Sequence, residues 1–309
     1  MTNSIDVSKT AWVITGPTSG IGHRTALKLA GHGTVVLIGR DPGKLAKVQA
    51  EIKARPGGHA LAVVADMSDP ASARHAAEEV AALCLPIAGV LNNAGVMPLR
   101  AGKTTRGLDL AYATNHLGPF AFTGTLIPHL ADGTTIVFIT SAVEDPERKP
   151  AVRAGFRGGR FISAEAGGRG DWKPGGSAKP GYDAYATSKQ GNLATVLAFA
   201  REFPRLRFRA IEPGLNPGTG LARDAGPALR IIARVIAPLG RVVPTWSTPK
   251  RAAGVITKIL TDPSDATGTY YNEKGQPMQA SRQVSDPAFS DLVVAQTREL
   301  LAKVTSEGN

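Results

Sequence analysis

Short runs of β-branched and other apolar residues alternate with longer segments of helical periodicity along most of the chain. The run Ile136–Ile139 has no polar position, which is typical of a central parallel strand covered on both faces. Strands are predicted at Trp12–Thr15, Thr34–Gly39, Leu61–Ala65, Gly89–Leu91, Thr135–Thr140, Arg207–Ile211 and Gly268–Tyr271. Helices are predicted at Gly22–Ala30, Pro42–Ala54, Pro70–Leu83, Thr105–Leu130 and Ala184–Phe203. This order predicts an α/β fold with a single doubly wound, Rossmann-type parallel sheet of about seven strands and helices on both faces.

Two segments interrupt this alternation. Glu144–Tyr182 is long, Gly-rich and basic, and loops of this length in a compact domain are usually functional or disordered. We interpret it as an insertion loop. Leu215–Thr248 contains an apolar and basic helix, Ala228–Leu239, and we interpret it as a substrate lid, with a membrane-contacting or plain surface helix as alternatives. No repeat or linker separates two cores, so residues 1–309 are predicted to form one domain.

Composition is that of an ordinary globular protein. Hydrophobic residues make up 42% and charged residues 20% of the 309 positions, which fits an α/β domain with one large core. The N-terminal residues lack the apolar core of a signal peptide, and no run approaches the ~18 apolar residues of a transmembrane helix, so we expect a soluble, cytoplasmic protein. The one cysteine, Cys84, has apolar neighbours and is expected to be a buried helix residue rather than a nucleophile.

The net charge of +11 is compatible with nucleic acid, anionic lipid or a dinucleotide phosphate as a ligand. Part of the excess is local, because residues 148–179 hold eight Lys/Arg against two acidic residues. No aromatic-rich basic groove and no DNA-reading motif accompanies them. We therefore favour a solvated basic loop and expect no nucleic-acid partner, while binding of a polyanion by this segment stays as the less favoured alternative.

A glycine-rich turn with the spacing TGxxxGxG follows the first predicted strand and opens the first helix. Glycines there let backbone N–H groups approach an anion, and the helix N-terminus favours negative charge. The turn predicts a dinucleotide phosphate site, and a tight turn without a ligand is the alternative. The candidate residues are Gly16, Thr18, Ser19, Gly20, Ile21 and Gly22.

The end of the second predicted strand bears on the choice of dinucleotide. An acidic side chain at the Gly39 position would hold both ribose hydroxyls, which glycine cannot do. Arg40 beside it offers a guanidinium fork suited to a 2′-phosphate. We therefore expect NADP(H), unless Arg40 is only solvated. Asp66, followed by Met67, could contact the adenine amino group, or Asp66 or Asp69 could cap the next helix.

Tyr185 and Lys189 lie four residues apart and therefore share one face of the predicted helix. An ammonium group beside a phenol lowers the phenol pKa toward the range of a general acid/base. Ser141 closes an apolar strand, and Asn92–Gly95 follows another. Each motif alone also fits an ordinary cap or turn, but their order along one chain favours a catalytic site.

These motifs, together with Asn115 and Pro213-Gly214, resemble the short-chain dehydrogenase/reductase superfamily from about Ala11 to the end of the chain. Within it the chain is similar to the retinol dehydrogenase and protochlorophyllide reductase group. The narrower resemblance depends on Gly39-Arg40-Asp41, Tyr185–Leu197, Gly268–Tyr271 and the helix Asp286–Leu301.

The resemblance implies an NADP(H)-dependent oxidoreductase that interconverts a carbonyl and an alcohol. Tyr185 would be the acid/base, Lys189 would hold the nicotinamide ribose and stabilise the tyrosinate, Ser141 would bind the substrate oxygen, and Asn115 would anchor a water between Lys189 and solvent. The implied cofactor site adds Asp66, Met67, Asn92, Ala94, Gly95, Pro213 and Gly214 to the glycine turn, Arg40, Tyr185 and Lys189.

Two departures from the family pattern leave questions open. The separation of Ser141 and Tyr185 is longer than usual, so the insertion could shape the pocket, mediate oligomer contacts or block access. Thr219 stands one position late, and its contact with the cofactor is undecided. The apolar lid suggests a lipophilic or aromatic substrate, and a homodimer or homotetramer through Thr105–Leu130 and Ala184–Phe203 is one option. The alternative is an NADP-sensing or partner-binding protein without turnover.

Overall fold

The computed structural model describes residues 10–214 and 247–306. Its strands form one seven-stranded sheet in the order β3-β2-β1-β4-β5-β6-β7, and all neighbours are parallel. The strands are β1 (Ala11–Thr15), β2 (Thr34–Gly39), β3 (Ala60–Val64), β4 (Ile87–Asn92), β5 (Thr135–Ile139), β6 (Arg207–Ile211) and β7 (Thr269–Tyr271). The predicted doubly wound α/β sheet is confirmed, with strand ends shifted by two residues at most.

Burial of the strands follows their place in the sheet. The central strands β1 and β5 are buried at every position, which explains why their sequences show no polar alternation. The edge strand β3 leaves Leu61 and Val64 exposed. In this protein an uninterrupted apolar run in the sequence therefore corresponds to a strand at the centre of the sheet, where helices cover both faces.

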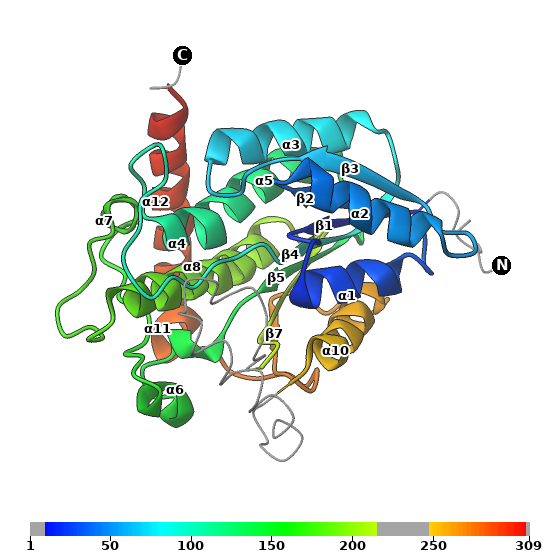
Figure 1. The fold of residues 1–309 in the computed structure, drawn as a ribbon. Helices are drawn as coiled ribbons and strands as arrows, with labels where there is room; N and C mark the ends of the chain where they lie inside the picture. The colour runs from blue at the N-terminus through cyan, green and yellow to red at the C-terminus, as the bar shows by residue number, and fades with distance from the viewer. Residues whose placement is uncertain (1–9, 215–246, 307–309) are drawn as a thin grey trace, which may run out of the picture.

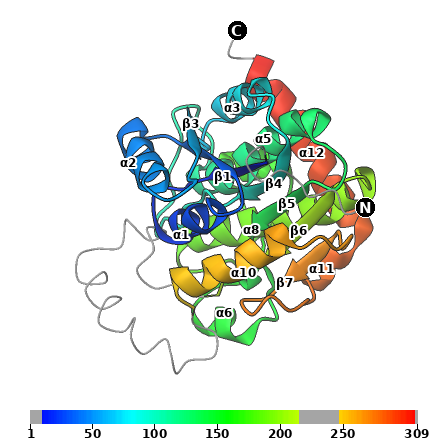
Figure 2. The same ribbon diagram turned by 90° about the vertical axis from the view of Figure 1, so that its right-hand side faces the viewer.

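Helices cover the two faces as two layers (Figures 1 and 2). One layer consists of α1 (Gly20–Leu29), α2 (Pro42–Lys53) and α10 (Pro249–Thr261). The other consists of α3 (Pro70–Ala82), α4 (Leu110–Tyr112), α5 (Gly118–Leu126), α8 (Pro180–Glu202) and α12 (Pro287–Ser306). A capping residue followed directly by a proline marks the start of three helices. The capping residue is Asp41 for α2, Asp69 for α3 and Thr248 for α10. None of the described helices is long and apolar enough to cross a membrane.

The prediction of one continuous helix over Thr105–Leu130 is wrong, because the helix starts later and is divided into several pieces. Asp109 caps α4 by accepting from the N–H of Tyr112, and Gly107 before it has a left-handed φ of 74°, so the helix begins only at Leu110. A π-helical turn, η1 (Ala113–Leu117), then separates α4 from α5, and a 3-10 turn, η2 (Ile127–His129), ends the segment. Such π turns are frequent at functional sites.

Two other predictions need correction. Cys84 is exposed rather than buried, because α3 ends at Ala82 and Cys84 takes a left-handed φ of 51° after it. The segment Glu144–Tyr182 is not a plain loop. The turn η3 (Ala142–Glu144) ends at its first residue, α6 (Lys149–Arg153) and α7 (Ala164–Arg169) lie within it, and α8 begins at Pro180. Residues of the predicted lid from 215 to 246, including Thr219, lie outside the described residues.

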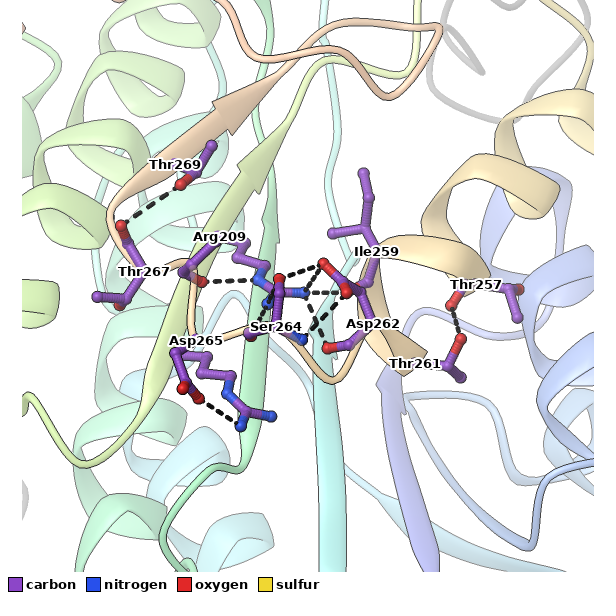
Figure 3. A network of polar contacts seen from close by, with 11 residues as sticks. Arg209, Thr257, Ile259, Thr261, Asp262, Ser264, Asp265, Thr267 and Thr269 are labelled. Carbon is purple, nitrogen blue, oxygen red and sulfur yellow. Dashed lines mark hydrogen bonds and ion pairs between the residues drawn. The ribbon is translucent and has the colours of Figure 1, made fainter.

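Arg209 on β6 ties the C-terminal end of α10 to the chain that leads into β7 (Figure 3). Its side chain is fully buried, and it donates to the carbonyl oxygens of Ile259 at 2.7 Å, Ser264 at 2.6 Å and Ala266 at 2.9 Å. An ion pair with Asp262 at 3.2 Å offsets the guanidinium charge. One side chain thus joins three segments near the amino end of β7, away from the carboxyl ends of the strands.

Candidate active site

The predicted catalytic side chains meet at the carboxyl edge of the sheet. Ser141 follows β5 in an extended conformation, and Tyr185 and Lys189 lie on α8. Lys189 places its Nζ 5.5 Å from the Tyr185 ring centroid and donates to the carbonyl oxygen of Ile139 at 2.8 Å. A Cβ on Gly95 would lie 3.1 Å from Oδ1 of Asn115 and 3.7 Å from Nζ of Lys189. The structure therefore brings the four residues together around the loop after β4.

Burial shifts the pKa values of both titratable residues away from their usual range. Lys189 is only 3% exposed, and desolvation lowers its pKa to about 7. Desolvation raises the pKa of Tyr185, an interaction with the Ser141 hydroxyl lowers it, and the charge of Glu212 raises it further. Because burial also disfavours the charge on Lys189, the lowering of the Tyr185 pKa by this lysine stays a prediction.

Asn115 connects three segments of the chain. Its Oδ1 accepts from the N–H of Val96 at 2.8 Å, and its Nδ2 donates to the Val96 carbonyl and to Oγ of Ser188, each at 2.9 Å. It stands in the π turn η1 and is fully buried. These bonds hold the loop after β4 against α8, and the water relay through Asn115 stays a prediction.

The glycine turn packs closely against the loop after β4. Gly16 and Gly20 have left-handed φ angles of 68° and 57°, and a Cβ on Gly16 would lie 2.9 Å from Cα of Ala94. Asn93 donates from Nδ2 to the carbonyl oxygens of Thr15 and Gly16, each at 3.0 Å. Asn93 lies within the motif Asn92–Gly95, but the sequence did not predict this contact. The turn, with Thr18, Ser19, Ile21 and Gly22 in it, thus gets its shape from a neighbouring strand end.

The predicted cofactor residues after β2 and β3 differ in exposure and in hydrogen bonding. Arg40 is exposed, while its neighbour Asp41 caps α2 and pairs with Lys44 at 2.9 Å. Asp66 accepts from the N–H of Ser68 at 2.8 Å, and it is Asp69 that caps α3.

Met67 and Asn92 place their side chains in the interior. Met67 belongs to the core, and Asn92 donates to Oγ1 of Thr123 on α5 at 2.9 Å. Pro213 and Gly214 end the first described stretch, and Gly214 has a φ of 73°. The side chain of Met67 is therefore part of the core, and its predicted contact with a cofactor stays a prediction.

Comparison with known proteins decides the family. Residues 10–149 match the profile described as short chain dehydrogenase. The short-chain dehydrogenase/reductase pkfC of Emericella nidulans is 31% identical over 254 residues, which cover 75% of this chain and 74% of that protein. The chain belongs to the short-chain dehydrogenase/reductase family.

Further similarities agree with this assignment. Retinol dehydrogenase 12 of Mus musculus is 36% identical over 133 residues, 42% of each chain, in line with the predicted retinol dehydrogenase-like group. A blue fluorescent protein from a metagenomic library, solved in complex with NADPH, superposes with a TM-score of 0.64 at 21% identity, covering 88% of this chain and 98% of that one, and supports the fold. The family consists of NAD(P)-linked oxidoreductases, so the oxidoreductase class of this short-chain dehydrogenase/reductase is established.

The insertion of this short-chain dehydrogenase/reductase folds back onto Tyr185. Phe156 stacks on Tyr182 with ring centroids 4.2 Å apart and an interplanar angle of 10°, and its ring lies 6.3 Å from that of Tyr185. Met97 and Val143 pack against the same small apolar cluster. Phe156 was not predicted. Its only signal in the sequence is an aromatic residue within a Gly-rich basic segment.

Two carboxyl groups near the site, the buried Glu144 and the half-buried Glu212, were also missed. Glu144, on η3, accepts from the N–H of Ser281 at 3.0 Å and from its hydroxyl at 2.6 Å, and desolvation raises the Glu144 pKa to about 7. Glu212 stands between β6 and Pro213-Gly214, where desolvation likewise raises its pKa. Neither belongs to a recognisable motif, so only the packing of the chain reveals them.

Proposed function

We propose that this protein is an NADP(H)-dependent oxidoreductase that interconverts a carbonyl and an alcohol, with Tyr185 as general acid/base. The observation that carries this proposal is the convergence of Asn115, Ser141, Tyr185 and Lys189 beside the glycine turn. Burying an ammonium group and a phenol together costs folding free energy. Active sites often keep buried titratable groups in spite of this cost, so the arrangement supports a catalytic role.

NADP(H) as the cofactor is supported by the residues around the glycine turn. Gly39 lies next to that turn, because a Cβ on it would be 3.9 Å from Cδ of Pro17, and Arg40 follows. Asp41 cannot serve as the ribose ligand without giving up its cap and its pair with Lys44. Among the described residues no ion pair engages Arg40. The fold neighbour solved with NADPH is consistent with this choice.

The chemistry assigns one task to each side chain. When bound, NADPH supplies a hydride to the carbonyl carbon. Tyr185 gives its phenolic proton to the carbonyl oxygen as the C=O π electrons move onto that oxygen, and the product is the alcohol. Ser141 donates to the same oxygen, where negative charge develops. Lys189 stabilises the tyrosinate that remains until a proton returns from solvent.

The expected substrate is lipophilic. Phe156, Tyr182, Met97 and Val143 form an apolar wall beside Tyr185, and apolar contacts of this kind favour apolar ligands. The similarity to retinol dehydrogenase 12, whose name refers to an apolar alcohol, points in the same direction.

Cofactor titration is the first test, with NADPH and NADH added to wild type and to Arg40→Ala. We expect wild type to prefer NADPH. The variant should lose about tenfold or more in NADPH affinity, because hydrogen bonds to charged groups contribute roughly 1.5–3 kcal/mol, while NADH affinity stays unchanged. All-trans-retinal and a small polar ketone then serve as carbonyl probes. NADPH binding without reduction of any carbonyl would favour the sensing alternative, and failure to bind either dinucleotide would overturn the proposal.

A further inference from the structure

The short helix α6 projects at one end of the molecule, next to the candidate acid/base. It follows β5 and η3 along the chain, and in Figures 1 and 2 it is the lowest of the labelled elements. Ala151 on α6 and Phe156 just after it are buried and belong to the apolar cluster that contains Tyr185. One side of α6 therefore packs on the candidate site, and its other side is exposed.

Cations cover the exposed side of this helix. Residues 148–164 hold five Lys/Arg and no acidic residue. Lys149, Arg153 and Arg157 are exposed, and no ion pair engages them within the part of the chain that the structure describes. The Arg157 guanidinium donates only to backbone carbonyl oxygens, including that of Phe156 at 2.9 Å. These three cations are named the α6 patch.

The acidic residues that flank the α6 patch have other partners. Asp145 accepts from the N–H of Glu147 at 2.8 Å, and the Glu147 carboxylate lies 3.9 Å from Arg282. Asp183, at the start of α8, accepts from the N–H of Ser177 at 3.0 Å. The patch therefore keeps a net positive charge toward solvent.

An exposed apolar side chain lies among these cations. Val152 is 37% exposed, and Pro150 and Ala154 near it are exposed as well. The aromatic residues of the same segment, Phe156 and Phe161, are buried. Single-stranded nucleic acid stacks on accessible aromatic rings, whereas Lys and Arg around an apolar residue suit the headgroup layer of an anionic bilayer. The composition of the exposed side therefore favours lipid as the partner.

We propose that the α6 patch docks this protein on the surface of a bilayer that contains anionic lipids, with Val152 in the headgroup layer. A lipophilic carbonyl compound concentrates in such a bilayer, because its apolar surface leaves water there. Docking through α6 brings this source of substrate next to the apolar wall beside Tyr185. The delivery of substrate rests on the proposed function, whereas docking itself needs no turnover.

Co-sedimentation of the full chain with lipid vesicles tests the docking. Vesicles of phosphatidylcholine mixed with anionic phosphatidylglycerol are compared with vesicles of pure phosphatidylcholine. We expect wild type to bind only the anionic vesicles, and to lose them at about 1 M salt, where charges are screened within about 3 Å. The double variant Lys149→Gln, Arg153→Gln should bind about 25-fold more weakly, because each cation near an anionic surface contributes about 1 kcal/mol, or about fivefold in affinity.

The matched control is the double variant Lys47→Gln, Lys53→Gln on α2, which lies away from α6 in both views. Both lysines are exposed, and no ion pair engages them among the described residues, so the control removes the same net charge from another surface. Its vesicle affinity should stay within about twofold of wild type. Equal losses in the two double variants would mean that net charge alone attracts the protein, and would overturn the proposal. Absence of wild-type binding to the anionic vesicles would overturn it as well.

Retinal carried in the vesicles separates this inference from the proposed function. Wild type should reduce it faster in anionic than in pure phosphatidylcholine vesicles. The variant Lys149→Gln, Arg153→Gln should lose this difference and still reduce a water-soluble ketone at the wild-type rate. Docking without reduction of any carbonyl would overturn the proposed function and leave the docking surface in place. Binding of RNA instead of vesicles, lost in the same variant, would assign the α6 patch to nucleic acid and overturn the lipid proposal.

Discussion

Lys189 shows how strongly burial controls single residues in this site. Its ammonium group has the Ile139 carbonyl as a hydrogen-bond acceptor and is almost completely removed from solvent. The low pKa of about 7 follows from this desolvation. A negative charge placed beside it would favour the charged form again, because opposite charges attract.

Tyr185→Phe should reduce carbonyl turnover by about 10²–10⁴-fold, because loss of a general acid/base has effects of this size. The substitution removes only the hydroxyl, and the ring keeps its place near Phe156. NADPH affinity is therefore expected to remain within a few-fold of wild type. Steady-state reduction of retinal and NADPH titration on the same preparation check both statements. Turnover at the wild-type rate in the variant would contradict the role of Tyr185.

Several site residues could be predicted from sequence because their spacing is local. The turn Gly16–Gly22 is predicted because it lies at the start of one helix, α1. The pair Tyr185 and Lys189 is predicted because both residues lie on one face of α8. Asn93 and Phe156 could not be ranked in this way, since their roles depend on contacts with segments far away in the chain.

At the scale of elements, polar side chains fasten the C-terminal segments to the sheet. Glu144 ties η3 to Ser281, which caps α11 (Arg282–Ser285). Arg209 ties β6 to the end of α10. Both connections span more than forty residues of sequence. The Glu144 contact places the start of α11 next to η3, the turn that follows Ser141.

Glu144→Gln is expected to flatten the pH dependence of stability. The Glu144 pKa is raised from 4.5 to about 7, so the carboxyl group contributes most stability below pH 4.5 and loses this contribution as pH rises through 7. Between pH 5 and pH 8 wild type should lose on the order of 2 kcal/mol more than the variant. Glutamine can still accept from the Ser281 N–H. Urea unfolding at the two pH values measures the difference, and equal losses in both proteins would contradict the assignment.

Arg209→Met should lower the free energy of unfolding by about 3–5 kcal/mol, because it leaves buried carbonyl groups without donors. Arg207→Met on the same strand is the matched control. Arg207 pairs at 2.8 Å with Asp265, whose side chain is 97% exposed, and such a pair contributes roughly 0–1 kcal/mol. Urea unfolding of both variants tests the contrast, which would be refuted by equal effects.

At the scale of the whole molecule, α12 covers α8. Arg298 forms two hydrogen bonds of 2.7 Å with the Glu202 carboxylate, and Thr297 reaches His116 at 3.1 Å. Burial lowers the pKa of His116 to about 4, so this contact is neutral near pH 7. All seven strands of the described residues share one sheet, and α12 packs on its core, while one domain for residues 1–309 stays a prediction.

We expect no assembly through α8, the helix predicted as one option for a dimer contact, because α12 packs against it. Light scattering on the purified full chain should give a mass near 32.2 kDa. A mass of twice that value which returns to the monomer in Arg298→Asp would contradict this expectation. A dimer that is insensitive to Arg298→Asp would indicate a different surface.

The sequence by itself determined the order of the strands along the chain, the starts of α2 and α3 with their prolines, and the motifs that identify the family. These features depend on local propensity and on periodicity, which neighbouring residues encode. Tertiary structure alone decided the rest: the π turn that holds Asn115, the aromatic wall that the insertion places beside Tyr185, and the desolvation of Lys189, Glu144 and Glu212. The physical reason is that desolvation and contact between distant segments depend on how the chain packs, and spacing along the sequence does not record either.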